Sequence, residues 1–470
     1  MRSSGRMLLT CLAVLVLGPV LAMGNGLYTP TVGARANAMG GAFVGLADDY
    51  SAVYWNPAGI TQIKGMELTV TGQDVATMAS REGFVQYEGL EGSEDLFQFA
   101  IAEVGATSDA KLMIAPGLFF YTDPGPLRAI VDKVGIAAYT LTEYGVKWDG
   151  SDVIDGFVSH DRNYDWISLS ADQQDYDSSI RSYSISPVVA KEVIPGLSIG
   201  LTGNFVYSHY KVADVVMVET PVVFEQPEGD FWVLALTPLQ FEDDVTAWGY
   251  GATFGALYRF NRETSVGLTV RSPMNMKYDG TYGFMASATT PDTSFVYEES
   301  HDSTFELRYP TWAGVGVARR DFMFDGLTLA VDVQWTDWST FEKINRDVDW
   351  GSTETPEEEQ DELVLTQLKW EDTVEVAVGF DYRLSRSISL HMGYRNSPSP
   401  VPDDTYDFVM PFSSKNTIGL GCTIRQDFWR ASIGLEYQAG DERNVSGTDD
   451  MNGKHVEDTL VPSLSFTYAF

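Results

Sequence analysis

The sequence predicts an all-β transmembrane barrel of about 14 antiparallel strands, with an N-terminal hatch (plug) domain in its lumen. Three observations predict this fold class. After an N-terminal export signal, no segment has the roughly 18 consecutive apolar residues that a membrane helix needs. Most of the chain alternates apolar with small or polar residues, as β-strands do. Short turns alternate along the chain with long acidic connections, as in outer-membrane barrels.

Residues 1–22 have the composition of a secretory signal peptide. Two arginines precede a mostly apolar run over residues 7–21, and residues 20–22 form a cleavage site. The sequence therefore predicts export from the cytoplasm. Removal of the signal leaves Cys422 as the sole cysteine, so the exported chain can form no intramolecular disulfide.

The chain is strongly acidic, with 31 Lys and Arg against 66 Asp and Glu and a formal net charge of −35. Nucleic-acid binding depends on Lys and Arg that neutralise phosphates, so no nucleic-acid partner is expected. Aromatic residues nevertheless make up 13% of the chain. Without membrane helices, such a chain can span a membrane only as a closed barrel, which satisfies its backbone hydrogen bonds internally. We therefore expect a multi-pass β-barrel in the bacterial outer membrane.

Residues 23–62 differ from the rest of the chain, because they are rich in Gly and Ala and show no period of 2. Two adjacent glycines there can adopt positive φ or allow another backbone to approach closely, and a proline favours an extended residue before it. These features predict a compact segment with a fixed bend, enclosed by the barrel as its hatch; the alternative is a plain turn into the first strand. The candidate hatch or gate residues are Arg35, Gly40, Gly41, Asn56, Pro57 and Ala58.

Residues 63–470 are predicted to form the barrel. From Leu327 to Trp335, for example, every second residue is apolar and those between are small or polar, so one strand face is apolar. A soluble β-sandwich would alternate too, but many segments reach the about 9–11 residues of a tilted membrane strand. The predicted strands are 65–73, 111–121, 132–142, 178–192, 197–211, 244–260, 263–276, 303–320, 325–338, 369–383, 386–396, 413–425, 427–441 and 456–470.

The connections between these strands are short and long in alternation. An even number of strands places both termini on the short-turn side, which is periplasmic in outer-membrane barrels, so the hatch would enter from the periplasm. The long acidic connections, expected outside the cell, are 74–110, 143–177, 212–243, 277–302, 339–368, 397–412 and 442–455.

The last strand carries an aromatic row. Leu464, Phe466, Tyr468 and Phe470 alternate with small residues, which predicts a lipid-facing girdle on the closing strand. A C-terminal aromatic strand resembles the signal that bacterial barrel-assembly machinery reads, and we expect that machinery as a partner.

Several stretches together resemble the FadL/TodX family of outer-membrane transporters for long-chain fatty acids and other hydrophobic compounds. The N-terminal stretches resemble the hatch of that family, and the later ones resemble its middle and late strands, so the resemblance spans nearly the whole exported chain. The stretches are Gly33-Ala-Arg35, Met39-Gly-Gly-Ala-Phe43, Ala47-Asp-Asp49, Tyr54-Trp-Asn-Pro-Ala58, Ser186-Pro-Val-Val-Ala190, Gly255-Ala-Leu-Tyr258, Gly267-Leu-Thr-Val-Arg-Ser-Pro273, Asp337-Trp-Ser339, Trp370-Glu-Asp372, and Gly393-Tyr394 followed by 398–402.

The resemblance implies a fourteen-stranded barrel with a small N-terminal plug, in agreement with the strand pattern. It also implies passive uptake of a hydrophobic small molecule, with a long-chain fatty acid as the leading ligand and an alkane or aromatic hydrocarbon as alternatives. The ligand would be caught among extracellular loops, pass to a lumenal pocket, and leave through the hatch or sideways through the wall. Outer-membrane lipid and lipopolysaccharide would surround the barrel, which we expect to be a monomer.

Two of the expected extracellular loops contain apolar residues that should face water. Exposed apolar patches often mark interaction sites, and in the family this region resembles the ligand-capture groove. The alternative is a small helix that packs on its own loop. The candidate capture residues are Phe231, Trp232, Leu234, Leu236, Phe284 and Phe295.

Strand parity places several charged residues on the lumenal face. The candidates for lumenal ligand or hatch contacts are Arg271, Arg308, Arg395 and His391. An arginine fork suits a fatty-acid carboxylate, whereas a salt-bridge network would brace the hatch. An unpaired lumenal arginine would favour a carboxylate ligand, and a fully paired set would favour a neutral hydrocarbon. Arg35, in the hatch, could meet an acidic residue of the wall.

No enzyme chemistry, metal or cofactor is expected. The five histidines are scattered without metal-ligand spacing. Gly196-Leu-Ser-Ile-Gly200 matches a hydrolase pattern, but that pattern needs a strand-turn-helix elbow and here it begins a strand.

Other functions remain open at this point. Some members of the family fold bind secreted proteins at the outer membrane as part of a secretion system, and the large acidic loops would suit that role. An aqueous porin fits poorly, because a plug and the aromatic content argue against an open polar pore.

Overall fold

The computed structural model describes most of the chain. The described residues are 32–86, 101–109, 111–149, 157–161, 164–169, 175–224, 231–290, 293–349, 365–407, 410–446 and 453–470. The predicted signal peptide, residues 1–22, lies outside them.

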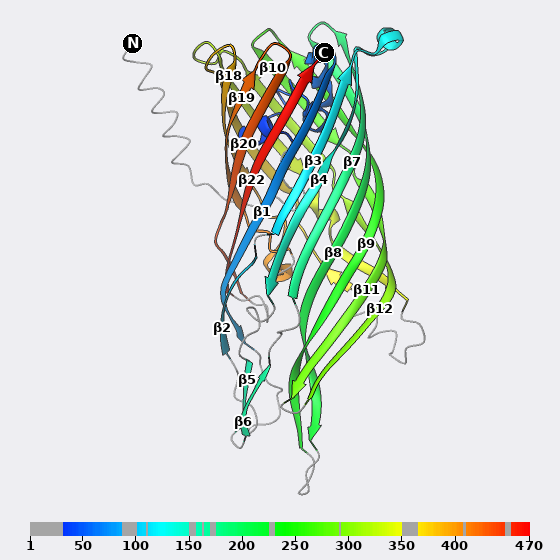
Figure 1. The fold of residues 1–470 in the computed structure, drawn as a ribbon, viewed down its shortest axis with the longest axis vertical. Helices are drawn as coiled ribbons and strands as arrows, with labels where there is room; N and C mark the ends of the chain where they lie inside the picture. Colours follow the sequence, from blue (N-terminus) through cyan, green and yellow to red (C-terminus); the bar gives the residue numbers. More distant parts are fainter. Residues whose placement is uncertain are drawn as a thin grey trace, which may run out of the picture.

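The chain forms a closed barrel of 14 antiparallel strands, as the sequence predicts (Figure 1). The first strand pairs with the last, from Glu67 opposite Ala469 to Gly83 opposite Gly453, so the sheet has no free edge there. Two of the 14 strands are each interrupted and carry two labels, β10 with β11 and β12 with β13. The barrel strands are β1 (Glu67–Gln86), β3 (Lys111–Thr122), β4 (Lys133–Asp149), β7 (Asp175–Ile194), β8 (Leu197–Phe224), β9 (Phe231–Arg259), β10 (Thr264–Arg271), β11 (Met274–Thr290), β12 (Thr293–Tyr309), β13 (Trp312–Arg319), β14 (Leu327–Thr336), β17 (Thr373–Arg383), β18 (Ile388–Ser397), β19 (Lys415–Arg425), β20 (Trp429–Gly440) and β22 (Gly453–Ala469).

Shorter elements lie inside the barrel or at its ends. Inside are the helices α2 (Ala34–Ala38) and α3 (Ala52–Trp55) and the 3-10 helix η1 (Pro57–Gln62). The others are η2 (Gly125–Ala129), η3 (Trp338–Thr340), η4 (Asp403–Thr405), β2 (Ile101–Thr107), β5 (Phe157–Asp161), β6 (Tyr164–Leu169), β15 (Lys343–Val348), β16 (Leu365–Gln367) and β21 (Arg443–Val445).

Two of the predicted loops are instead strand. β8 and β9 stay paired from Leu197 opposite Tyr258 to Phe224 opposite Phe231, and β11 and β12 stay paired as far as Thr290 opposite Thr293. These hairpins project from the end of the barrel opposite the C-terminus (Figure 1). The prediction of loops over 212–243 and 277–302 is therefore wrong, because runs of valine and threonine there favour continued pairing.

The outer face of the barrel is apolar and the inner face is small or polar. In β14, Val331 and Val333 are exposed on the outside, whereas Asp332 and Gln334 are buried inside. Aromatic residues gather on the outer face near the short turns, where Tyr258 packs on Phe260 with ring centroids 4.5 Å apart. The aromatic row of the last strand also faces outward, as expected. No helix within the described ranges is long and apolar enough to cross a membrane.

Residues 32–63, which we call the inner segment, lie inside the barrel near the short-turn end (Figure 1). Glycines of the wall allow their backbones to meet. A Cβ added at Gly267 would overlap the Val44 carbonyl, and one at Gly393 would overlap the backbone of Met39. The other wall glycines in such contact are Gly200, Gly255, Gly316, Gly379, Gly419 and Gly434. The inner segment is therefore held by direct backbone contact around much of the barrel.

The glycine contacts give a first prediction. Gly393→Ala should loosen the inner segment by about 1–3 kcal/mol, because the added methyl group has no room. Hydrogen exchange of residues 34–60 should rise while the barrel strands stay protected. Gly72→Ala is the matched control, since a Cβ there meets no atom within 4 Å. Equal protection in the two variants would contradict the account.

Candidate functional site

An ion-pair network joins the inner segment to the barrel wall at the short-turn end. The Arg35 guanidinium, on α2, lies 2.6 Å from the Asp48 carboxylate of the same segment and 2.6 Å from that of Asp381 on β17. Asp48 also pairs with Arg320, at the end of β13, at 3.2 Å. Burial alone would raise the pKa of the Asp48 carboxyl, but the charges of Arg35 and Arg320 outweigh it and lower that pKa to about 2.

Two further polar contacts hold the middle of the inner segment. Asp332 of β14 accepts a hydrogen bond from the Val44 backbone N–H at 2.6 Å. Asn56 is extended, with φ −161°, as Pro57 predicts, and its side-chain amide donates to the carbonyls of Val44 and Ala256. Its side-chain oxygen accepts from the Ala58 N–H and so begins η1. The residues around Pro57 are thus bonded to the wall as well as to their own segment.

Gly40 and Gly41 have φ of 64° and 78°, in the left-handed region that glycine adopts without strain. They turn the chain directly after α2. A Cβ at Gly40 would also lie within 3 Å of the Tyr394 backbone.

Aromatic side chains cover the inner segment on its lumenal side. Tyr54 lies 6.0 Å from Tyr139 of β4 and 6.4 Å from Trp312 of β13, and Tyr139 stacks on Phe119 of β3 at 5.9 Å. Together with Trp55 these residues form what we call the inner aromatic cluster. All five side chains are buried, so the packing between the inner segment and the wall is aromatic here.

Arg271 of β10 belongs to this cluster. Its guanidinium lies 4.3 Å from the Tyr54 ring centroid and 5.1 Å from that of Trp312, and it donates to the Tyr54 carbonyl at 3.2 Å. Arg271 is therefore lumenal, as predicted, and its charge is engaged by cation–π contacts.

The wall of the barrel has a break in its pairing between β3 and β4. The two strands pair only from Thr122 opposite Val134 to Gly117 opposite Tyr139. Further from the short turns, an isolated bridge joins Asp109 to Lys147. Residues 140–146 of β4 have no described backbone partner on β3, although they remain paired with β7 on their other side. We call this break the wall gap.

β4 bends at the wall gap. The register with β7 shifts between Thr140 and Thr142, which marks a β-bulge at Leu141. Residues 139–146 are all buried, in contrast to the alternating burial of an ordinary barrel strand. The strand therefore leaves the plane of the wall here and runs toward the lumen.

A second group of aromatic residues lies beyond the wall gap. Tyr144 of β4 packs on Phe412 at 4.7 Å, and Phe412 packs on Trp370 at 5.8 Å. Trp370 contacts Trp338 and Phe341, at 5.4 and 5.1 Å. We call these five residues the outer aromatic cluster. The wall gap thus lies between two buried aromatic clusters, which reach it at Tyr139 and Tyr144.

The Arg181 side chain reaches across the wall gap. Arg181 of β7 pairs with its cross-strand neighbour Glu143 on β4, with Nε 2.8 Å from Oε1. A terminal nitrogen of the same guanidinium extends past β4 and donates to the Met113 sulfur on β3 at 3.1 Å. Arg181 therefore bridges the strands that backbone hydrogen bonds leave separate.

The other three residues predicted to face the lumen lie in different environments. Arg395 is buried and pairs with Glu436 at 3.0 Å. His391 is buried and hydrogen bonded to Thr423 at 2.7 Å, beside Asp381. Arg308 is exposed, on the outer side of β12, so its predicted lumenal position is wrong. The parity of this strand reverses at Pro310, between β12 and β13, and the prediction assumed one continuous strand.

Most of the predicted capture residues cannot be placed by side chain. Phe231, Trp232, Leu234, Leu236 and Phe295 lie in paired strand near the hairpin tips, and their side chains lie outside the described residues. The alternative of a small helix is wrong for the backbone of Phe231–Leu236, which pairs with β8.

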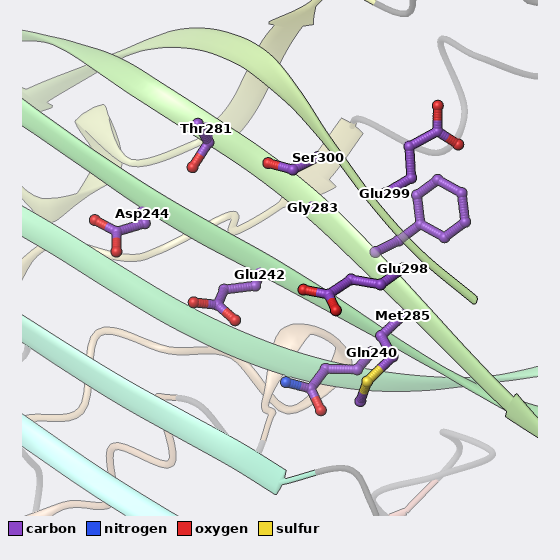
Figure 2. Close-up of a pocket in the computed structure, with 10 residues that line it drawn as sticks. Gln240, Glu242, Asp244, Thr281, Gly283, Met285, Glu298, Glu299 and Ser300 are labelled. Carbon is purple, nitrogen blue, oxygen red and sulfur yellow. The ribbon is translucent and has the colours of Figure 1, made fainter. Parts of the chain in front are cut away.

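Phe284 lies beside a polar pocket rather than an apolar one. Figure 2 shows the side chains that line this pocket between β9, β11 and β12. The cavity is about 200 Å³, and its lining includes Glu242, Asp244, Glu298 and Glu299. Lys211 pairs with two of these carboxylates, at 2.6 and 3.3 Å. Such a lining does not favour a hydrophobic ligand.

The resemblance implies a sideways exit through the wall as one alternative, but the position of the wall gap was not predicted, although one residue signals it. Pro116 lies within β3 just where its pairing with β4 ends. Proline has no backbone N–H, so within sheets it is confined to edges and bulges.

Comparison with known proteins covers the whole barrel. The model of the family described as outer membrane protein transport protein (OMPP1/FadL/TodX) matches residues 13–470. Outer membrane protein P1 of Haemophilus influenzae is 21% identical over 376 residues, which are 76% of this chain and 74% of that protein. A long-chain fatty acid transport protein of Escherichia coli is 23% identical over 224 residues, which are 45% of this chain and 44% of that protein.

Among solved structures, the toluene transporter TodX of Pseudomonas putida has the same fold. It superimposes with a TM-score of 0.65 at 15% identity, over 94% of this chain and 99% of that chain.

The lowered pKa of Asp48 gives a prediction of pH dependence. Because this pKa is depressed, the ion pairs of Asp48 stabilise the docked inner segment fully above pH 4, and the contribution is lost as the pH falls toward 2. We expect a contribution on the order of 1–2 kcal/mol at neutral pH. Asp48→Asn should lower the protection of residues 34–60 at pH 7 and flatten its fall below pH 4, measured by hydrogen exchange corrected for the intrinsic rate.

Asp325→Asn, on an exposed position of the β13–β14 turn, is the control. It should change neither the protection of residues 34–60 at pH 7 nor the fall of that protection below pH 4. If Asp48→Asn left the pH profile of the wild type intact, the ion pairs of Asp48 would not hold the segment.

Proposed function

Because the chain belongs to the OMPP1/FadL/TodX family of outer membrane transport proteins, we propose that it carries hydrophobic molecules passively through the barrel lumen and releases them sideways at the wall gap. The chain is an outer-membrane channel of the FadL/TodX type for hydrophobic compounds. Members of this family are transport channels rather than enzymes. The route, the ligand and the gate are the parts that we propose.

The wall gap is the observation that carries the proposed route. A backbone N–H or C=O that faces lipid without a partner costs several kcal/mol, so neighbouring barrel strands normally stay hydrogen bonded along their whole membrane-spanning length. Here residues 140–146 of β4 lack the β3 partners that closure would give them. Aromatic clusters on both sides offer an apolar molecule a surface that leads to this break.

The inner segment supports the same route, because its contacts favour an anchor. Arg35 is tied to the wall by an ion pair and Gly40 by close backbone contact. Gly41 and Asn56 are tied to it by hydrogen bonds. Pro57 and Ala58 pack against Gly200, where a Cβ would overlap their backbone. We propose that the inner segment blocks the periplasmic end and diverts the ligand sideways, rather than opening for each molecule.

For the ligand, we propose a molecule that the lumen recognises by its apolar chain. A long-chain fatty acid is the leading candidate, as in the name of the Escherichia coli relative, and a neutral hydrocarbon is the alternative. Arg395 pairs with Glu436, and Arg271 packs on Tyr54 and Trp312. By the criterion stated above, these engaged charges favour the neutral hydrocarbon, whereas the name of the relative favours the fatty acid; recognition through the apolar chain suits both.

We assign the capture of the hydrophobic ligand outside the cell to the tips of the β8–β9 and β11–β12 hairpins. The apolar residues from Leu236 to Phe231 lie about 16–33 Å along β9 from Phe241, at roughly 3.3 Å per residue. We propose that Phe231, Trp232, Leu234, Leu236 and Phe295 collect the ligand there. We further propose that the barrel acts as a monomer, surrounded by lipid and lipopolysaccharide and inserted by the barrel-assembly machinery.

Blocking the wall gap from the lipid side tests the route. Ile114 of β3 faces outward beside the gap and is 61% exposed. In a background with Cys422→Ser, the variant Ile114→Cys should lose most uptake of dodecanoate and 1-dodecanol after reaction with pyrenylmaleimide. Reaction with a small methylating thiol reagent should leave uptake nearly unchanged, because only the bulky group fills the gap.

Leu118→Cys is the matched control. Leu118 faces outward on the same strand, is 49% exposed, and lies where β3 and β4 are paired. Equal inhibition at both positions, or none at Ile114→Cys, would show that the ligand does not leave through the wall gap.

A further inference from the structure

A cavity of about 180 Å³ lies at the short-turn end, at the seam between the inner segment and strands β14, β17, β18 and β19. Its position is separate from the aromatic clusters and from the wall gap. A space of this size holds several water molecules, each of which takes about 30 Å³ in the liquid. The lining residues are Arg35, Asp48, Arg320, Asp321, Gly326, Thr328, Asp381, Arg383, Ser389 and Arg425.

Four arginines line this cavity against three carboxylates, in a chain where acidic residues outnumber basic ones by 66 to 31. The carboxylates already have partners. Asp48 pairs with Arg35 and Arg320, and Asp381 pairs with Arg35. Asp321 accepts the Gly326 N–H at 2.7 Å and so closes the β13–β14 turn.

Two guanidinium groups are left over. Within the described part of the chain, neither Arg383 nor Arg425 has a carboxylate within ion-pair distance. Both are exposed residues that line the cavity from the ends of β17 and β19. The two hydroxyl side chains of the lining, Thr328 and Ser389, add neutral donors. The cavity therefore offers an excess of hydrogen-bond donors and positive charge.

We propose that this cavity binds a small oxyanion, carboxylate or phosphate, between the guanidinium groups of Arg383 and Arg425. Guanidinium forks match the geometry of both anions and give charge-assisted hydrogen bonds. A bound oxyanion lies next to Arg35 and competes with Asp381 and Asp48 for it. Occupancy of the site therefore loosens the ion pairs that hold the inner segment. The existence of this site does not rest on the lateral route proposed above, although the site adjoins the segment that we propose blocks the periplasmic end.

Titration calorimetry on the purified full-length barrel tests the site, with inorganic phosphate and butyrate as separate probes. The wild type should bind at least one of them, and Arg383→Gln/Arg425→Gln should weaken that binding by about tenfold or more for each guanidinium removed. Arg386→Gln, an exposed arginine of the same β17–β18 turn outside the cavity lining, is the matched control and should bind as the wild type does.

The two probes distinguish the sources of the anion. Binding of butyrate alone points to a carboxylate compound, binding of phosphate alone points to a phosphate group, and binding of both supports a general oxyanion site. No binding to the wild type, or unchanged binding to the double variant, overturns the proposal. Uptake of 1-dodecanol by the double variant shows whether the barrel is intact. We expect wild-type uptake, and a loss of uptake would count against the fold of the variant or against the transport proposal, not against the anion site.

Discussion

The need to pair every backbone group within the membrane is the constraint on which the rest of this structure depends. It closes 14 strands into one sheet, with β1 against β22, and it leaves only the outer and inner faces to vary. The outer face becomes apolar and the inner face small or polar. Because the constraint is so strong, the missing backbone pairing between β3 and β4 points to a functional role for this part of the wall. A proline at position 116 and a bulge at Leu141 mark the break, and the Arg181 side chain reaches across it to Met113 of β3.

The firm attachment of the inner segment is consistent with an exit at the wall gap. Wall glycines bring the segment into backbone contact on many strands, and Asp332, Asn56 and Arg35 add polar contacts to fixed partners. An inner segment held in this way is costly to displace, which is why we propose that a molecule in the lumen leaves by another exit. The aromatic clusters lead to the wall gap, while the charged seam lies on the opposite side of the inner segment. Apolar transport and ionic anchoring are thus kept apart in space.

The alternation of residues was enough to predict the barrel and its inner and outer faces, because side-chain parity in a strand follows directly from backbone geometry. Parity fails where a strand is interrupted. It misplaced Arg308, since β12 and β13 meet at Pro310 with reversed parity. For the inner segment, the type of contact could be predicted but not the partner residues. Glycine content and Asn56-Pro57 indicated close packing and a bend, but the pairing of Arg35 with Asp381 joins residues 346 positions apart. The wall gap depends on which strand edges stay unpaired, and only Pro116 carries a local sign of it.

Photo-crosslinking tests the central claim most directly, that a hydrophobic ligand leaves the lumen between β3 and β4. Outer membranes that carry the protein would be loaded with a dodecanol that bears a diazirine group on its alkyl chain, irradiated, and analysed by peptide mass spectrometry. The account predicts adducts on residues 113–116 and 139–144, at the edges of the wall gap. Adducts confined to residues 34–62 of the inner segment, with none at the gap, would contradict it and would place the exit through the periplasmic end.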